Sequence, residues 1–216
     1  MRMRRKRSDE AGTAAAAGEG AEQQAGPEVE GVRAKGPWDA SERHVDEDDP
    51  NRADLGALSV EGHPEVELRL QVDEASQQVQ AVMLVGRDGA VELRPFASAR
   101  HEDLWDELRP RLSEEAKRHG GTVEEVDGPF GPALRLSMPV VDGEGRRGTQ
   151  LSVVHGIAGP RWMLRVTAFG RAATAYDEDQ PLETTMRSVI VNRGTTPMAP
   201  GDPLPLTLPA GARRMG

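Results

Sequence analysis

The chain has 216 residues, of which 37% are hydrophobic, with 24 glycines, 16 prolines and no cysteine. The lack of cysteine excludes disulfides, thiolate metal sites and cysteine nucleophiles. The net charge of −9 disfavours broad contact with nucleic acid or anionic membrane, and no apolar run approaches the ~20 residues that a membrane helix needs. We therefore expect a cytoplasmic protein with one domain, extra tails and no membrane contact.

Residues 1–52 are predicted to form a disordered, charged tail. Alanine, glycine, glutamate and glutamine dominate it, and so little apolar surface cannot offset an ordering entropy of ~1–2 kcal/mol per residue. Residues 2–7 form a basic block that resembles the start of a signal peptide, but no apolar segment follows. Trp38 stands alone among polar residues. We expect it to dock on the domain, with binding of a partner or simple exposure as the alternatives.

Residues 53–208 are predicted to form a single α+β domain, and residues 209–216 a C-terminal tail. The first half of the domain contains three segments with strand-like alternation or continuous apolar character, at 66–72, 79–85 and 91–96. An Asp88-Gly89 pair predicts a tight turn between the last two.

A helix is predicted next, with Ser98 as its N-cap and Gly120 after its last turn. Pro110 removes a backbone donor, so the helix should kink or split there. Its apolar stripe at helical spacing consists of Leu104, Trp105, Leu108 and Leu112.

Four more strands are predicted, at 122–126, 134–138, 149–155 and 162–169. The last two should form a hairpin that turns across 156–160, because Gly159-Pro160 is a turn signal. One face of the final strand is wholly apolar and should meet the core. It consists of Trp162, Leu164, Val166 and Ala168.

A loop at 172–180 precedes a second helix, which Pro181 should begin and Gly194 should end. Prolines after Thr195 forbid regular structure, and that segment should lie extended along the domain. The order of elements predicts an α+β fold: a mainly antiparallel sheet with two principal helices packed on it.

Six short motifs together resemble a known family. They are Gly-Pro-Trp-Asp at 36–39, Asp54-Leu55-Gly56, Pro95-Phe96-Ala97, Gly128-Pro129-Phe130-Gly131, Gly159-Pro160-Arg161-Trp162 and Arg193-Gly194. In this order, over about residues 36–209, they resemble the actinobacterial family catalogued as domain of unknown function 3710. That family has no established activity, so the resemblance implies no catalytic residue. Ala158 stands where the family often has an acidic residue, so this position should carry no essential chemistry.

The order of strands and helices also resembles the Mog1/PsbP-type sandwich. Members of that group are commonly assembly or binding proteins. This likeness concerns the fold and, by itself, assigns no function.

The residues offer no catalytic or metal motif. No two histidines stand at i+3 or i+4, and no Gly-x-Ser-x-Gly occurs. The glycine-rich segment 143–148 precedes a strand, so it indicates an exposed hairpin loop rather than a phosphate cradle. We interpret His155 as a strand-end histidine, with a general base as the less favoured alternative. We expect no enzyme activity, cofactor or metal.

Four arginines form a candidate anion-binding patch. Arg161 and Arg165 should project from one face of a strand, about 13 Å apart. Arg187 and Arg193 come from the second helix and its end, and the four could meet on an otherwise acidic protein. Alternatively, each arginine pairs with a nearby carboxylate, which the 36 acidic residues favour.

Two functions follow from these features. The first is a non-catalytic binding or assembly module with an unknown protein partner. The alternative is weak, non-specific association with nucleic acid through the basic N-terminal arm, because a short cationic block on a flexible chain can contact phosphates.

Overall fold

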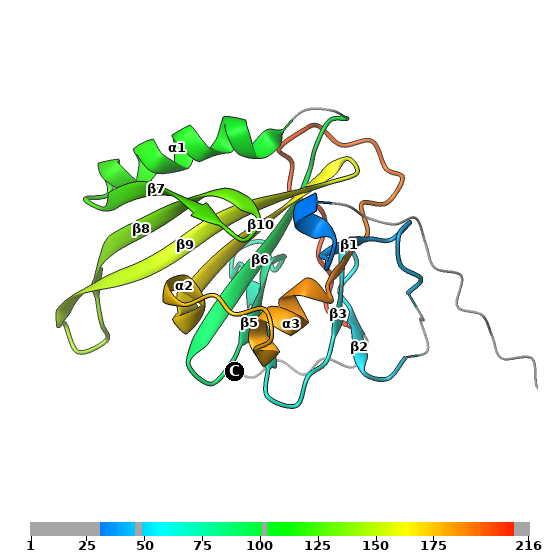
Figure 1. Cartoon of the computed structure of the whole chain (residues 1–216), viewed down its shortest axis with the longest axis horizontal. Coiled ribbons are helices and arrows are strands. Elements are labelled where there is room, and N and C mark those ends of the chain that lie inside the picture. The colour runs from blue at the N-terminus through cyan, green and yellow to red at the C-terminus, as the bar shows by residue number, and fades with distance from the viewer. Residues whose placement is uncertain (1–30, 46–48, 101–102, 210–216) are drawn as a thin grey trace, which may run out of the picture.

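The computed structural model describes residues 31–45, 49–100 and 103–209, which contain two β-sheets with helices on both sides of the larger one (Figure 1). The larger sheet has seven strands, and every pairing within it is antiparallel. In spatial order they are β4 (Glu67–Val72), β5 (Val79–Val85), β6 (Gly89–Ala97), β10 (Trp162–Gly170), β9 (Arg147–Gly159), β8 (Gly131–Val141) and β7 (Thr122–Gly128).

The smaller sheet has four short strands. It pairs three strands from residues 38–61 with one strand at residues 190–191. β1 and β11 pair in parallel, with Trp38 opposite Ile190, and β3 pairs antiparallel with β11 and with β2. In spatial order the strands are β1 (Trp38–Asp39), β11 (Ile190–Val191), β3 (Leu58–Glu61) and β2 (Arg52–Asp54).

The alternation of apolar residues predicts all seven strands of the larger sheet, and the expectation of a mainly sheet protein with helices is confirmed. The same pattern misses the whole smaller sheet. Its strands have only two to four residues each, which is too short to display a period of two.

One core lies between the two sheets, where α2 (Arg171–Thr174) and α3 (Pro181–Arg187) also pack. Leu182 and Met186 of α3 are buried in it, and Pro181 begins this helix as predicted. The predicted apolar face of β10 is confirmed, because all four of its members belong to this core: Trp162, Leu164, Val166 and Ala168.

α1 (Leu104–Arg118) covers the opposite face of the larger sheet at its β7–β9 end (Figure 1). The predicted apolar stripe is confirmed: Leu104 and Trp105 are buried against the strands, and the other two members pack at the margin. Gly156 of β9 lies under Trp105, where an added Cβ would stand 2.4 Å from the indole ring. Trp105 also donates its Nε1 to the carbonyl of Pro132 at 2.7 Å.

The hairpin between β9 and β10 turns more tightly than predicted. β9 continues to Gly159 and β10 begins at Trp162, so Pro160 and Arg161 form the turn, the latter with φ of 62°. The predicted turn across 156–160 is wrong because Gly156 serves the contact with Trp105 within the strand rather than a change of chain direction.

Both principal helices differ from prediction at their boundaries. The N-cap of α1 is Asp103 rather than Ser98, and its Oδ1 accepts from the backbone N of Trp105 at 2.9 Å. Pro110 lies within one continuous helix, so the predicted split is wrong. Its ring is exposed, while the apolar stripe on the inner side holds both halves to the sheet.

The second principal helix is shorter than predicted. α3 ends at Arg187, with Ser188 as its C-cap, and not at Gly194. The β-branched Ile190 and Val191 instead form β11. The predicted loop at 172–180 is also corrected at its start, where Arg171–Thr174 make the single turn of α2.

The predicted tail, residues 1–52, contributes folded structure from Gly31 onwards. Arg33 is buried and donates to both carboxylate oxygens of Glu42 at 2.8 and 3.0 Å. Asp39 accepts from the indole Nε1 of Trp162 at 2.6 Å. We call Arg33, Asp39 and Glu42 the polar clasp. The folded part therefore begins before the predicted tail boundary. Arg33 and Glu42 are buried by pairing with each other, and Asp39 is buried by pairing with Trp162, which apolar content does not reveal.

Both ends of the described chain dock on the domain. Trp38 is half-buried, and its backbone N donates to the carbonyl of Val189 at 2.9 Å, so the expectation of docking is confirmed. After a turn at 199–202, the segment from Pro203 to Leu206 lies extended along the domain, as predicted. Leu204 N donates to Pro95 O at 2.9 Å, and Pro203 and Leu206 form isolated β-bridges. Residues 1–30 and 210–216 lie outside the described residues.

A candidate binding face on the large sheet

One face of the larger sheet is covered by α1 over only part of its width. α1 packs on β7, β8 and β9, and its first residues also pack with Phe96 of β6 and Met163 of β10. Most of the other side chains on this half of the face are partly or fully exposed. We call this half the open face. It consists of Glu67, Arg69 and Gln71 of β4, Met83 and Val85 of β5, Ala90, Glu92 and Arg94 of β6, and Arg165, Thr167 and Phe169 of β10.

Strand alternation explains the composition of the open face. In β6, Val91 and Leu93 point into the core between the sheets, so Glu92 and Arg94 point the opposite way. On the edge strand β4, Glu67 lies opposite Val85 and Arg69 lies opposite Met83. On the other three strands the antiparallel registers place the side chains in three rows, which change from apolar through mixed to cationic. The rows are Val85 with Ala90 and Phe169, Met83 with Glu92 and Thr167, and Arg94 with Arg165.

Two arginines of the open face share one carboxylate. Arg94 Nε lies 2.9 Å from Glu92 Oε1, and Arg165 Nη2 lies 3.6 Å from the same oxygen. The second distance is too long for a hydrogen bond. The three side chains are mostly buried, with 14% of Glu92, 20% of Arg165 and 30% of Arg94 exposed. Arg165 is therefore held chiefly by charge attraction and by packing.

The guanidinium of Arg165 is incompletely compensated. Burial lowers its pKa, and the charge of Arg94 lowers it further, against the opposing effect of Glu92 and, more weakly, Glu115 of α1. Arginine nevertheless stays protonated in proteins, so the shift measures an energetic cost of the charge. The Nε of Arg165 is buried and makes no hydrogen bond within the described residues. The ring of Phe96 lies 5.6 Å from its Cζ.

The structure does not bring the four predicted arginines together. Arg161 is exposed on the β9–β10 turn. Arg187 packs on the core side of the sheet, where it donates to Tyr176 Oη at 2.7 Å and Gly36 O at 3.2 Å. Arg193 donates to the carbonyl of Thr196 at 2.7 Å.

The predicted arginine patch is therefore not formed, because α3 packs against the face opposite to Arg165. The alternative, in which each arginine pairs with a carboxylate, holds for Arg165. Arg187 and Arg193 bind a phenol and backbone carbonyls instead.

Sequence reasoning missed Arg94 and Glu92 as members of the site. Their alternation with Val91 and Leu93 was a usable signal, since it marks a polar strand face. Their proximity to Arg165 depends on the pairing of β6 with β10. A whole helix and three strands separate these two strands in sequence, so local pattern does not reveal the pairing.

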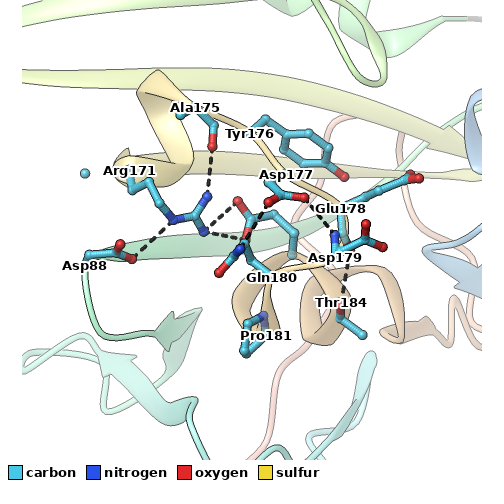
Figure 2. A network of polar contacts seen from close by, with 12 residues as sticks. Asp88, Arg171, Ala175, Tyr176, Asp177, Glu178, Asp179, Gln180, Pro181 and Thr184 are labelled. Atoms are coloured by element: carbon cyan, nitrogen blue, oxygen red, sulfur yellow. Dashed lines mark hydrogen bonds and ion pairs between the residues drawn. The ribbon is translucent and has the colours of Figure 1, made fainter.

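A second polar cluster, shown in Figure 2, is structural. Arg171 donates to both carboxylate oxygens of Glu183 at 2.9 and 2.7 Å, to Ala175 O at 2.8 Å and to Asp88 Oδ1 at 3.3 Å. Glu183 is only 1% exposed. The pair with Glu183 ties α2 to α3, and the contact with Asp88 ties α2 to the β5–β6 turn. Together with Ala175 O, these partners engage each nitrogen of the Arg171 guanidinium.

His155 lies inside β9 and not at a strand end, which corrects the sequence interpretation. It is 5% exposed and packs edge-on against Phe130, with ring centroids 5.7 Å apart. Burial lowers its pKa to about 4. A general base must reach a substrate proton, and this packing keeps the ring from solvent. Within the described part of the chain, no group of three or more His, Asp or Glu is arranged to hold a metal.

The fold and the open face define a two-sheet α+β domain with one half-covered sheet. A family model described as protein of unknown function (DUF3710) matches residues 36–215. The chain belongs to that family, and the resemblance inferred from the six motifs is confirmed. A search of curated proteins finds no match. Among the helices of the described segments, none is long and apolar enough to span a membrane.

Proposed function

We propose that this protein is a non-catalytic binding or assembly module and that the open face receives a protein partner. The observation that carries the proposal is the half-covered sheet. Met83, Val85 and Phe169 are partly exposed there beside the mostly buried pair Arg94 and Arg165. Apolar side chains combined with arginine are enriched in protein interfaces.

The other buried arginines support this choice of surface. Arg33 donates two hydrogen bonds to Glu42 and a third to Pro37 O, and Arg171 is satisfied by Glu183, Asp88 and Ala175. These side chains hold segments of the chain together. Arg165 differs from them because its nearest carboxylate oxygen lies at 3.6 Å.

We further propose that the domain has the Mog1/PsbP-type sandwich architecture that the order of its elements suggests. Such an architecture would agree with a binding role, since members of that group are commonly assembly or binding proteins. The likeness is one of fold, so the partner must be identified by experiment.

Site-specific photo-crosslinking in the native cells tests the proposed function. A photoreactive amino acid is placed in the full chain at Thr167, in the middle of the open face, or at Thr174, an exposed position of α2. We expect one protein to crosslink at Thr167 and not at Thr174. Identical products at both positions, or none at Thr167, would overturn the proposal.

A second candidate function rests on the sequence alone. The basic block at residues 2–7 favours weak, non-specific association with nucleic acid. This block lies outside the described residues, and the open face does not depend on it. A binding comparison with and without the block separates the two functions.

A further inference from the structure

We propose that the open face binds an acidic segment of its protein partner, which places an Asp or Glu carboxylate against Arg165 and Arg94 and apolar side chains over Val85 and Phe169. The inference rests on the proposed function, because it names the chemistry of the partner for the same surface. Two observations support it. They are the charge balance of Arg94 and Arg165, and the change from apolar to cationic side chains across the three rows on β5, β6 and β10.

The charge balance favours a carboxylate ligand. Glu92 lies 2.9 Å from Arg94, which leaves Arg165 without a short ionic partner. A carboxylate from outside can make two parallel, charge-assisted hydrogen bonds to a guanidinium at about 2.7–2.9 Å. Such a contact strengthens as the partner displaces water from the partly buried site.

The geometry of the rows favours an extended segment. Residues two apart on a strand point to the same face and lie about 6.6 Å from each other. The cationic row and the apolar row of the open face are two such steps apart, from Arg165 to Phe169. An extended segment that lies along β10 would match both rows when an acidic residue and an apolar residue are four positions apart.

Acidic groups around the arginine pair make a polyanion a poor ligand. Glu92 lies beside both arginines, and the charge of Glu115 on α1 also acts on Arg165. The chain as a whole carries a net charge of −9. One carboxylate fits this local charge pattern, whereas a run of phosphates would be repelled by Glu92 and Glu115.

The probe for this inference is a phage-displayed library of random dodecapeptides, selected on the immobilised full chain. The same library is screened against Thr167→Trp, which fills the middle of the open face. Thermal unfolding checks that this variant folds. We expect the peptides that bind the parent and not the variant to carry Asp or Glu four positions from an apolar residue.

A double-mutant cycle with one selected synthetic peptide then assigns the contact. Replacing its acidic residue by the amide, or making Arg165→Met in the protein, should each weaken binding about tenfold or more. The two changes together should weaken it no further. Arg118→Met, at an exposed position in the last turn of α1, should leave the affinity unchanged.

Three outcomes would overturn the inference, and they differ in whether they also overturn the proposed function. Peptides that bind the open face equally well with acid or amide refute the acidic ligand and leave the proposed function standing. Failure to find peptides that distinguish the parent from Thr167→Trp refutes both. Displacement of the selected peptides by oligothymidylate at comparable concentration would show that phosphates bind Arg165 and Arg94 in place of a carboxylate.

Discussion

Trp162 connects three parts of the chain through one side chain. Its ring is fully buried in the core, its Nε1 donates to Asp39, and the guanidinium of Arg33 lies 5.2 Å from the ring centroid. We predict that Trp162→Ala destabilises the protein by about 3–5 kcal/mol, because a large core site is emptied. Urea unfolding measures the change. An unaltered midpoint would show that this side chain contributes little to the core.

The conservative variant Trp162→Phe separates packing from hydrogen bonding. Phenylalanine keeps most of the buried area but leaves the carboxylate of Asp39 without the indole donor. We expect a smaller loss than for alanine, about 1–3 kcal/mol. A loss as large as that of the alanine variant would place most of the effect in the polar clasp rather than in the core.

His155 predicts a pH dependence of stability. Its pKa is lowered by burial to about 4 in the folded protein, whereas the unfolded value is about 6.5. Between these values the unfolded chain binds a proton that the folded chain does not, so stability falls as the pH drops from 6.5 to 4, by up to about 3 kcal/mol. NMR titration of the imidazole should show no protonation at pH 5.5, whereas protonation near pH 6.5 would contradict the prediction.

At the level of single residues, alternation shows which way a side chain points but not what it meets. The sequence predicts that Trp162 faces the core and Arg165 faces away, and the structure agrees. The contacts of Arg187 do not follow from alternation, because its partners Tyr176 and Gly36 come from segments that local pattern does not connect. Burial through polar pairing, as in Arg33, leaves no apolar signal to detect.

The N-terminal elements predict a sharp difference between two truncations. Removing residues 1–30 should leave the melting temperature within about two degrees, since the composition of that segment offers little apolar surface. Removing residues 1–35 should lower it by several degrees, because it deletes Arg33 and leaves Glu42 buried without its cation. Arg33→Met in the full chain should reproduce the loss. Equal melting temperatures for both truncations would show that the polar clasp is dispensable.

The contact between α1 and β9 predicts that one methyl group added at Gly156 destabilises the protein. Gly156→Ala would place a Cβ 2.4 Å from the ring of Trp105, so we expect a destabilisation of about 1–3 kcal/mol through overpacking. Gly143→Ala is the matched control, since nothing lies within 4 Å of a Cβ there. Chemical denaturation of both variants tests the prediction, and similar midpoints would mean that α1 can shift at little cost.

At the scale of the elements, the length of a strand decides whether the sequence pattern predicts it. Strands such as β5 and β10 display a clear pattern over seven and nine residues and lie where expected. β1 and β11 have two residues each, and Val189 and Ile190 also continue the helical spacing of Leu182 and Met186. The pattern therefore predicts a helix that is longer than α3.

At the scale of the whole molecule, the basic block at residues 2–7 predicts weak, salt-sensitive binding of nucleic acid. The acidic balance of the chain opposes close approach of DNA, so binding should depend on the arm and disappear at moderate salt. A low-salt mobility shift compares the full chain with one that lacks residues 1–7. Equal binding by both, or none by either, would remove this function.

The open face is also a property of the whole molecule, and this explains why the sequence did not reveal it. It depends on which strands α1 covers and on the fact that β6 and β10 are neighbours in the larger sheet. Motifs identified the family, and strand patterns identified the core face of β10. The pairing of Arg94 with Arg165 required the register between distant strands.

The parallel pairing of β1 with β11 has a consequence for biosynthesis. Trp38 leaves the ribosome about 150 residues before its partner Ile190, a delay of roughly 8–30 seconds at 5–20 residues per second. Asp39 cannot contact Trp162 until 123 more residues have been made, so for most of that interval the polar clasp has no core to pack on. The Gly-Pro-Trp-Asp motif at 36–39 is thus made well before the strand it pairs with, so a nascent chain exposes it to chaperones and proteases until β11 has been synthesised.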